Sequence, residues 1–228
     1  MDAFHDYDAI IFDCDGVLFD SNQMKVVAFR LSARKAGFDA EAIDSFSEWQ
    51  SKNFGVSRYV AFDRLLTGEF GTVPPTATTN HLLHYYAQDV ATGYLAAAET
   101  DGARELIDLL KSFPLYVVSA SNEQEVRGVL RARKLATNFR AIYGSPATKV
   151  ENLRRVLDDF HEGARVLFIG DASADADAAS EVGVNFLFMS KHSLVFADMQ
   201  ERVLAGEFSQ VESLRDLIPF VGPKLRLL

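Results

Sequence analysis

Two hydrophobic patterns alternate along this chain. Runs of four apolar residues without polar alternation occupy 9–12, 115–118 and 166–169, and shorter or less regular strands are predicted over 142–144 and 185–189. Such runs are typical of parallel strands that are buried on both faces of a sheet. In the segments between them, apolar residues recur every three or four positions, as in amphipathic helices. The pattern predicts an α/β fold in which right-handed crossovers place helices on both faces of a parallel sheet.

One long segment interrupts this alternation. From Ser21 to about Leu95 no strand-like run occurs, and the spacing predicts helices that end at Gly37 and near Gly68, with a further helix over 80–95. We therefore expect a Rossmann-like parallel-sheet core, 1–20 and 96–228, with an inserted α-helical cap domain, 21–95. Because the insertion follows the first strand, it should cover the carboxyl edge of the sheet as a lid.

The later part of the chain is predicted to supply the remaining helices of the core. Helices are expected over 103–111 and 150–160, and over 211–218 at the end of the fold. Ser121 and Gln124 have the spacing of a capping box, which predicts that another helix begins at Ser121 and runs to about Lys134.

Composition narrows the possible partners. The chain has 228 residues, of which 48% are apolar and 24% charged, as in ordinary globular proteins. Its net charge of -9 leaves no basic footprint for nucleic acid or for an anionic membrane, and no apolar run approaches membrane-spanning length. The single cysteine, Cys14, excludes an intrachain disulfide, and the first residues lack the features of a signal peptide. We expect a cytoplasmic protein, either a monomer or a homodimer.

The first strand leads directly into two acidic residues. Asp13 and Asp15 follow the apolar run 9–12 and precede Gly16. Two carboxylates at the mouth of an apolar sheet repel each other unless a cation or a shared proton compensates. A polar turn is the simpler alternative, whereas a calcium loop is disfavoured because Val17 and Leu18 occupy positions that such a loop needs for an acid and a glycine. The favoured interpretation is a divalent-metal site with Asp13 as a nucleophile.

Three further segments place reactive residue types just after a strand and before a helix. Ser119 follows the second strand, Lys149 follows the third, and Asp171 with Asp175 follows the fourth. Taken singly, these residues could be a capping serine, a surface lysine and an acidic helix start. Because parallel strands end at a common edge, we expect them to meet Asp13 there.

In this order, the segments resemble the four successive motifs of the haloacid dehalogenase superfamily. The resemblance covers the core from Asp8 to Val184, with Phe12 to Leu18 matching the nucleophile motif. The insertion further resembles the subgroup with a small helical cap, which includes phosphoglycolate phosphatases and β-phosphoglucomutases. The stretch Gly55 to Arg58 is similar to that subgroup's substrate-specificity segment.

The resemblance assigns a role to each core residue. It implies that Asp13 attacks phosphorus to form an aspartyl-phosphate and that Asp15 protonates the leaving group and later activates water. It implies a Mg²⁺ cofactor held by the side chains of Asp13 and Asp171 and by the backbone carbonyl of Asp15. The remaining implied roles are phosphate binding by Ser119, Ala120 and Lys149, and orientation of Lys149 or a metal-bound water by Asp175.

Candidates in the cap concern the substrate. Arg58 and Lys25 are the expected substrate contacts, and Lys25 could hold an anionic group of the substrate as a point charge. For the other candidate functional side chains, the alternative is packing in the cap or simple exposure to solvent. They are Trp49, Lys52, Arg64, the histidine pair His81 and His84 at metal-ligand spacing, and Asp177.

The sequence thus predicts a Mg²⁺-dependent phosphatase of a small phosphorylated metabolite, either a sugar phosphate or a short phospho-acid. A haloacid dehalogenase is disfavoured because that chemistry needs neither Asp15 nor a magnesium site. A phosphosugar mutase and a non-catalytic binding protein are the remaining alternatives. Mutases of this subgroup carry a histidine shortly after the first motif, and Lys25 stands there instead, which favours transfer of the phosphoryl group to water.

Overall fold

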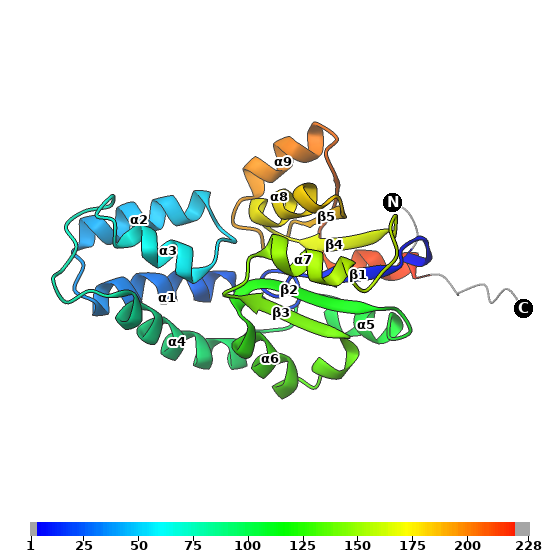
Figure 1. The fold of residues 1–228 in the computed structure, drawn as a ribbon, viewed down its shortest axis with the longest axis horizontal. Helices are drawn as coiled ribbons and strands as arrows, with labels where there is room; N and C mark the ends of the chain where they lie inside the picture. The colour runs from blue at the N-terminus through cyan, green and yellow to red at the C-terminus, as the bar shows by residue number, and fades with distance from the viewer. Residues whose placement is uncertain (1–3, 222–228) are drawn as a thin grey trace, which may run out of the picture.

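The sheet of this protein is parallel throughout. The computed structural model describes residues 4–221, with a six-stranded sheet in the order β3-β2-β1-β4-β5-β6 and a group of helices to one side of it (Figure 1). The α/β prediction is confirmed. The strands are β1 (Ala9–Phe12), β2 (Leu115–Asn122), β3 (Ala141–Ser145), β4 (Val166–Gly170), β5 (Asn185–Met189) and β6 (Ser209–Val211).

Helices cover both faces of the sheet. In β1, Ile10 and Phe12 pack toward one apolar cluster, whereas Ala9 and Ile11 pack toward the other. The first cluster includes α5 (Ala103–Leu109), α6 (Glu123–Ala132) and the 3₁₀ helix η3 (Leu214–Phe220), and the second includes α7 (Lys149–Leu157) and α8 (Ser173–Val182). A small third cluster joins β5 to α9 (Phe196–Leu204), and the short 3₁₀ helices are η1 (Phe4–Asp6) and η2 (Ala136–Asn138).

The strand register brings the candidate motifs to one edge. Phe12, the last residue of β1, pairs with Val117 in β2 and with Ile169 in β4. The residues that follow these three positions therefore lie at the same level of the sheet, where β1 and β4 end while β2 continues to Asn122. Because β1 lies between β2 and β4, the crossovers diverge on either side of it, and this switch point is where open α/β sheets hold their ligands.

The insertion between β1 and α5 is entirely helical in its regular structure. Three of its helices begin at capping residues, Asp39, Ser57 and Thr78, whose side chains accept a backbone N–H three residues later. An aromatic cluster around Phe29 holds the helices together, with the Tyr86 ring centroid 4.4 Å away. The four helices are α1 (Asn22–Lys35), α2 (Ala40–Lys52), α3 (Arg58–Leu65) and α4 (Thr79–Ala96).

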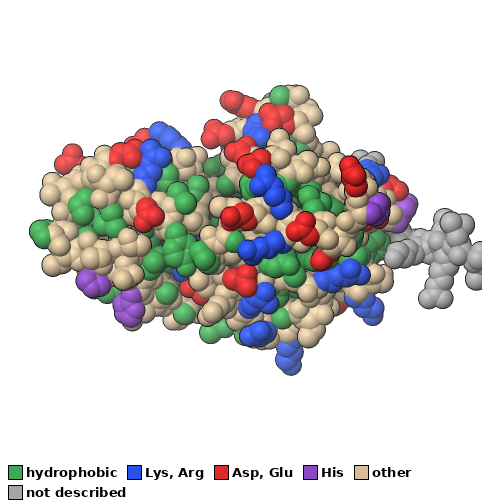
Figure 2. Space-filling view, in the orientation of Figure 1, with side chains coloured by type: hydrophobic (Ala, Val, Ile, Leu, Met, Phe, Trp, Pro, Cys, Tyr) green, Lys and Arg blue, Asp and Glu red, His purple; other side chains and the backbone are tan. Residues whose placement is uncertain are grey.

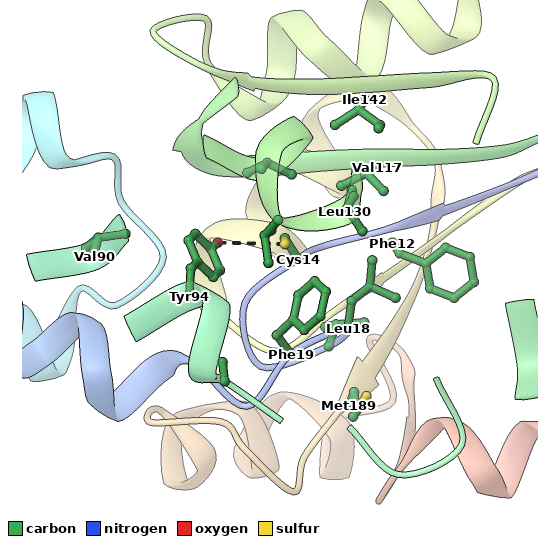
Figure 3. Close-up of a cluster of buried hydrophobic side chains, with 14 of the residues drawn as sticks. Phe12, Cys14, Leu18, Phe19, Val90, Tyr94, Val117, Leu130, Ile142 and Met189 are labelled. Atoms are coloured by element: carbon green, nitrogen blue, oxygen red, sulfur yellow. Dashed lines mark hydrogen bonds between the residues drawn. The ribbon is translucent and has the colours of Figure 1, made fainter. Parts of the chain in front are cut away.

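The end of α4 is anchored in the core. Figure 3 shows Tyr94 beside Phe19 and Cys14, residues of the loop that follows β1. The Tyr94 and Phe19 rings meet edge to face at 6.4 Å, and the Tyr94 hydroxyl lies 3.7 Å from the Cys14 Sγ atom. Residues 80 positions apart therefore meet directly below the carboxyl edge of β1.

Two sequence predictions about helix positions are wrong. Helix α6 is capped by Asn122, whose side chain accepts the N–H groups of Gln124 and Glu125 at 3.0 and 3.3 Å, so Ser121 remains in β2. The helix expected over 211–218 is present as the 3₁₀ helix η3 from Leu214, and its expected start is wrong because Val211 belongs to strand β6. Val211 pairs with Met189 at the edge of the sheet, and a three-residue edge strand is too short for periodicity to show.

The surface carries charges of both signs. On the face shown in Figure 2, acidic and basic side chains are interspersed over the core, without a continuous basic patch on that face. Within residues 4–221, no helix is long and apolar enough to cross a membrane.

Candidate active site

A cavity lies between the carboxyl edge of the sheet and the helical insertion. Its volume is about 50 Å³, counted as space open to the centres of water molecules. The core and the insertion both contribute polar side chains to its wall. The core supplies Asp13, Asp15, Ser119, Ala120, Ser121, Lys149 and Asp171, and the insertion supplies Lys25, Gln50, Asn53 and Arg58.

Three buried carboxylates form an acid cluster, and two of them, Asp13 and Asp171, line the cavity. Asp13, Asp171 and Asp175 each offer a carboxylate oxygen within 4.8 Å of the others. Burial raises the pKa of Asp13 to about 7, with Lys149 opposing the rise and Asp175 and Asp15 adding to it. Burial and the charges of Asp13 and Asp175 raise the pKa of Asp171 well above its usual value. The cluster is therefore short of positive charge.

The acid cluster fits a divalent cation. The Asp13 Oδ1 atom is buried and has no hydrogen-bond partner, which is unusual for a buried polar atom and fits a metal ligand. Mg²⁺ and similar hard cations prefer such carboxylate oxygens. Asp13 and Asp171 are the residues that would hold the ion, since Asp175 already forms an ion pair with Lys149.

The backbone at Gly16 allows the acids to approach. Gly16 has a positive φ of 74°, and a Cβ atom there would lie 2.2 Å from Asp171 Oδ2 and 2.5 Å from Asn22 Nδ2. The Asn22 amide donates to Asp171 Oδ2 at 2.6 Å and to the carbonyl of His192 at 2.8 Å. The first turn of α1 therefore positions one of the candidate metal ligands.

Lys149 is the cation nearest to the candidate nucleophile. Its Nζ atom lies 3.5 Å from Asp13 Oδ2 and forms an ion pair with Asp175. Burial would lower the pKa of Lys149, but the charges of Asp13 and Asp175 outweigh it and raise the pKa, so the ammonium stays charged. Thr148 and Glu151 form a capping box that fixes the start of α7, and with it Lys149.

Asp15 is surrounded by hydrogen-bond donors. Ser21 Oγ, Tyr94 OH and Ser121 Oγ donate to its carboxylate at 2.5, 2.6 and 2.7 Å, and Lys25 forms an ion pair with it. Burial would raise the pKa of Asp15, but the charge and hydrogen bond of Lys25, with the hydroxyl donors, lower it below its usual value. The carboxylate is held ionised and ready to accept a proton.

Both candidate substrate contacts line the cavity with their charges paired. Arg58 donates to Glu125 of α6 through two parallel hydrogen bonds of 2.7 and 2.5 Å, and its guanidinium lies 4.4 Å from the Tyr86 ring centroid. Lys25 is engaged by Asp15 and also by the Ser121 hydroxyl. Neither side chain is a free cation in this arrangement.

The other candidates lie outside the cavity wall. Trp49 stacks on Phe46, and the histidine ring of His81 lies 2.9 Å from the carbonyl of Thr76. Among the described residues, the acid cluster is the only group of three or more acidic, histidine or cysteine side chains spaced for a metal. The remaining candidates are also accounted for: Arg64 pairs with Glu69, Lys52 with Glu48 and Asp177 with Arg202, and His84 lies against Tyr85.

Four residues that donate hydrogen bonds to Asp15 or Asp171 were not singled out from the sequence. Ser21 and Asn22 immediately follow Asp20, so proximity to the first motif was a usable signal. Ser121 was interpreted as a helix cap rather than as a partner of Asp15. Tyr94 lies 79 residues from Asp15 on a helix with apolar periodicity, and nothing in the sequence indicated their contact.

The raised pKa of Asp13 predicts how metal-free protein responds to pH. In the folded state Asp13 keeps its proton up to about pH 7, whereas in the unfolded chain it loses it near 3.8. The folded state therefore binds more protons over this window, so the stability contributed by this group falls as pH rises toward 7. We expect the melting temperature in chelator to fall by on the order of 5 °C between pH 5 and pH 8. Excess Mg²⁺ should abolish most of the fall, because it neutralises the acid cluster.

Differential scanning calorimetry with and without Mg²⁺ checks this expectation. Asp13→Asn is the matched variant, and its metal-free melting temperature should depend less on pH. A wild-type melting temperature that does not change over pH 5–8, or that does not respond to Mg²⁺, would contradict the assignment of the acid cluster as a cation site.

Comparison with known proteins identifies the fold and the family. A family model described as haloacid dehalogenase-like hydrolase matches residues 7–183, more than half of the chain. No curated protein matches the chain.

Solved structures of the same fold span almost the whole chain. A haloacid dehalogenase-like hydrolase from Streptococcus pneumoniae has a TM-score of 0.72 at 19% identity, covering 96% of this chain and 100% of its own. A predicted phosphoglycolate phosphatase from Haemophilus somnus has a TM-score of 0.74 at 14% identity, covering 95% and 99%. CbbY from Rhodobacter sphaeroides, solved in complex with phosphate, has a TM-score of 0.73 at 18% identity, covering 92% and 96%. At these identities the structures establish the fold.

Proposed function

Because this chain belongs to the haloacid dehalogenase-like hydrolases, we propose that it is a Mg²⁺-dependent phosphatase of the cytoplasm. Its substrate is a small phosphorylated metabolite, either a sugar phosphate or a short phospho-acid. The observation that carries the proposal is the position of the ionised Asp15 beside the acid cluster and Lys149, in one cavity at the carboxyl edge of β1.

Asp13 and Asp15 divide the chemistry. A carboxylate oxygen of Asp13 attacks phosphorus, the new O–P bond forms, and the ester O–P bond breaks to give an aspartyl-phosphate and an alkoxide. A phosphate dianion near Asp15 favours its protonated form, so Asp15 can deliver the proton that the alkoxide needs. Water then attacks the aspartyl-phosphate, its proton passes to Asp15, and inorganic phosphate leaves. Each step conserves charge and atoms without another reactant.

Positive charge makes the attack of one anion on another feasible. A divalent cation held by Asp13 and Asp171, with the backbone carbonyl of Asp15 as a third ligand, supplies this charge when bound. Lys149 supplies a second positive charge and is positioned by Asp175. We assign the Ser119 hydroxyl and the Ala120 N–H group to the phosphoryl oxygens, because both residues line the cavity next to Asp13.

We propose that water, rather than a sugar hydroxyl, accepts the phosphoryl group. In mutases of the subgroup that this chain resembles, a histidine stands shortly after the first motif; here Lys25 stands there and is paired with Asp15, so no imidazole can exchange a proton with Asp15 at that position. Haloacid dehalogenation needs neither a metal-binding acid cluster nor a second carboxylate, so Asp15 and Asp171 would have no role in that reaction.

A phosphate-release assay with Mg²⁺ tests the proposed function. Purified protein is expected to release phosphate from p-nitrophenyl phosphate and from some members of a panel of sugar and short-acid phosphates. Thorough chelation should lower the rate by at least on the order of 100-fold, because the nucleophile then faces the phosphate without neutralising charge. Added Mg²⁺ should restore it. Full activity after chelation, or efficient conversion of β-glucose 1-phosphate into glucose 6-phosphate, would contradict the proposal.

A further inference from the structure

Both cations that the insertion brings to the cavity are paired with carboxylates, that of Asp15 buried and that of Glu125 half-buried. Arg58 and its partner Glu125 have side chains that are 4% and 21% exposed, and the pair joins α3 of the insertion to α6 of the core. Lys25 and its partner Asp15 are 7% and 9% exposed. The Arg58 guanidinium donates one hydrogen bond to each carboxylate oxygen of Glu125, which is the preferred geometry for such a pair.

The third cation of the cavity wall, Lys149, is also paired with carboxylates. Lys149 pairs with Asp175 and lies beside Asp13, where it serves the phosphoryl group in the proposed reaction. The cavity wall contains no other cationic side chain from the part of the chain that the structure describes. A second anionic group on the substrate would therefore enter a buried site without a countercharge, which is strongly unfavourable.

The other side chains that the insertion brings to the cavity wall are uncharged, some of them apolar and two of them amides. Gln50 and Asn53 at the end of α2 line the wall between the insertion and the acid cluster. Gln50 is only 6% exposed, and its side-chain oxygen is buried without a hydrogen-bond partner. A buried acceptor of this kind is normally satisfied by a donor, and an alcohol hydroxyl provides one whereas a carboxylate does not.

We infer that Glu125 is a specificity-determining residue: by neutralising Arg58 it restricts the enzyme to phosphate esters of uncharged alcohols and excludes substrates with a second anionic group. The inference rests on the proposed function and narrows it. Within the two substrate classes named above, it selects sugar and polyol phosphates over phospho-acids.

Two esters of the same chain length test the inference in the wild-type protein. 2-Hydroxyethyl phosphate and 2-phosphoglycolate each have two carbons, and they differ in a terminal hydroxymethyl or carboxylate group. We expect kcat/KM to be at least tenfold higher for 2-hydroxyethyl phosphate, with most of the difference in KM, because the carboxylate is rejected on binding.

The variant Glu125→Gln should reverse this preference. It removes the countercharge of Arg58 while keeping the size of the side chain, so the freed guanidinium can pair with the substrate carboxylate. We expect the ratio of kcat/KM values to move at least tenfold toward 2-phosphoglycolate. Glu69→Gln is the matched control, because Glu69 also forms two hydrogen bonds to an arginine, Arg64, but on the exposed surface of the insertion. It should leave the ratio unchanged.

Binding measurements separate this inference from the proposed function. Calorimetric titration of both esters into Asp13→Asn protein with Mg²⁺ gives the two affinities without turnover. If the wild type releases phosphate from no ester of the panel, p-nitrophenyl phosphate included, but 2-hydroxyethyl phosphate binds at least tenfold more tightly than 2-phosphoglycolate, the proposed function fails and the inference stands as a binding preference. Equal or tighter binding of 2-phosphoglycolate, no binding of 2-hydroxyethyl phosphate, or an unchanged ratio in a folded Glu125→Gln protein would overturn the inference.

Discussion

Asp13→Asn is expected to lower kcat by at least on the order of 10⁴-fold while the protein folds normally. The amide has nearly the shape of the carboxylate but cannot attack phosphorus. The Asp13 backbone N–H donates to the carbonyl of Ile169 at 2.9 Å, and the substitution does not touch this bond. Above pH 7, where Asp13 is ionised in the metal-free protein, the substitution also removes one charge from the acid cluster and relieves repulsion with Asp171 and Asp175, so the metal-free variant should melt no lower than the wild type there.

Phosphate release and calorimetry on the same preparations check this pair of effects. Asp177→Asn is the control, because Asp177 is an exposed aspartate that pairs with Arg202 outside the cavity, and its kcat should stay within about twofold of the wild type. Substantial residual activity in Asp13→Asn, beyond what contaminating wild-type enzyme explains, would remove Asp13 from the nucleophile position.

Asp15→Asn is expected to slow both halves of the reaction. General acid–base catalysis contributes about 10²–10⁴-fold, and the amide can neither protonate an alkoxide nor take a proton from water. The substitution should slow formation of the intermediate less with p-nitrophenyl phosphate than with an alkyl phosphate, because nitrophenolate leaves without a proton. Hydrolysis of the intermediate should be slow with both substrates.

Rapid-quench kinetics on Asp15→Asn distinguish the two steps. With p-nitrophenyl phosphate, we expect a burst of nitrophenol of about one equivalent per active site, followed by a slow steady state. A Ser121→Ala protein, which loses one of the hydrogen bonds to Asp15, should show a smaller change in rate. A linear time course without a burst would show that Asp15 does not activate water in the second step.

Periodicity in the sequence was sufficient for most of the fold. The buried runs at β1, β2 and β4 were visible because strands covered on both faces contain no polar alternation. Strand β6 was missed because an edge strand of three residues leaves no pattern. The start of α6 was misplaced because Ser121 and Asn122 are both good capping residues, and only the tertiary demand for Ser121 at Asp15 separates them.

The candidate site was predictable where chemistry follows a strand. Asp13, Lys149 and Asp171 could be brought together from sequence, since parallel strands end at a common edge. The contacts made by the insertion could not. Lys25 and Arg58 were recognised as cations near the substrate, but their partners Asp15 and Glu125 depend on how helices from two regions pack. Sequence spacing carries no information on such pairing, and the pairing decides whether a charge is available to a ligand.

Direct identification of the phosphorylated residue tests the central claim most closely. Asp15→Asn protein is mixed with an excess of p-nitrophenyl phosphate and Mg²⁺, quenched in acid, reduced with borohydride and mapped by tandem mass spectrometry. Borohydride converts an acyl phosphate on aspartate into homoserine, so the account predicts homoserine at position 13 and an unmodified side chain at Asp171 and Asp175. Homoserine at another aspartate, or phosphate release with no modified aspartate in a protein that shows the burst, would contradict it.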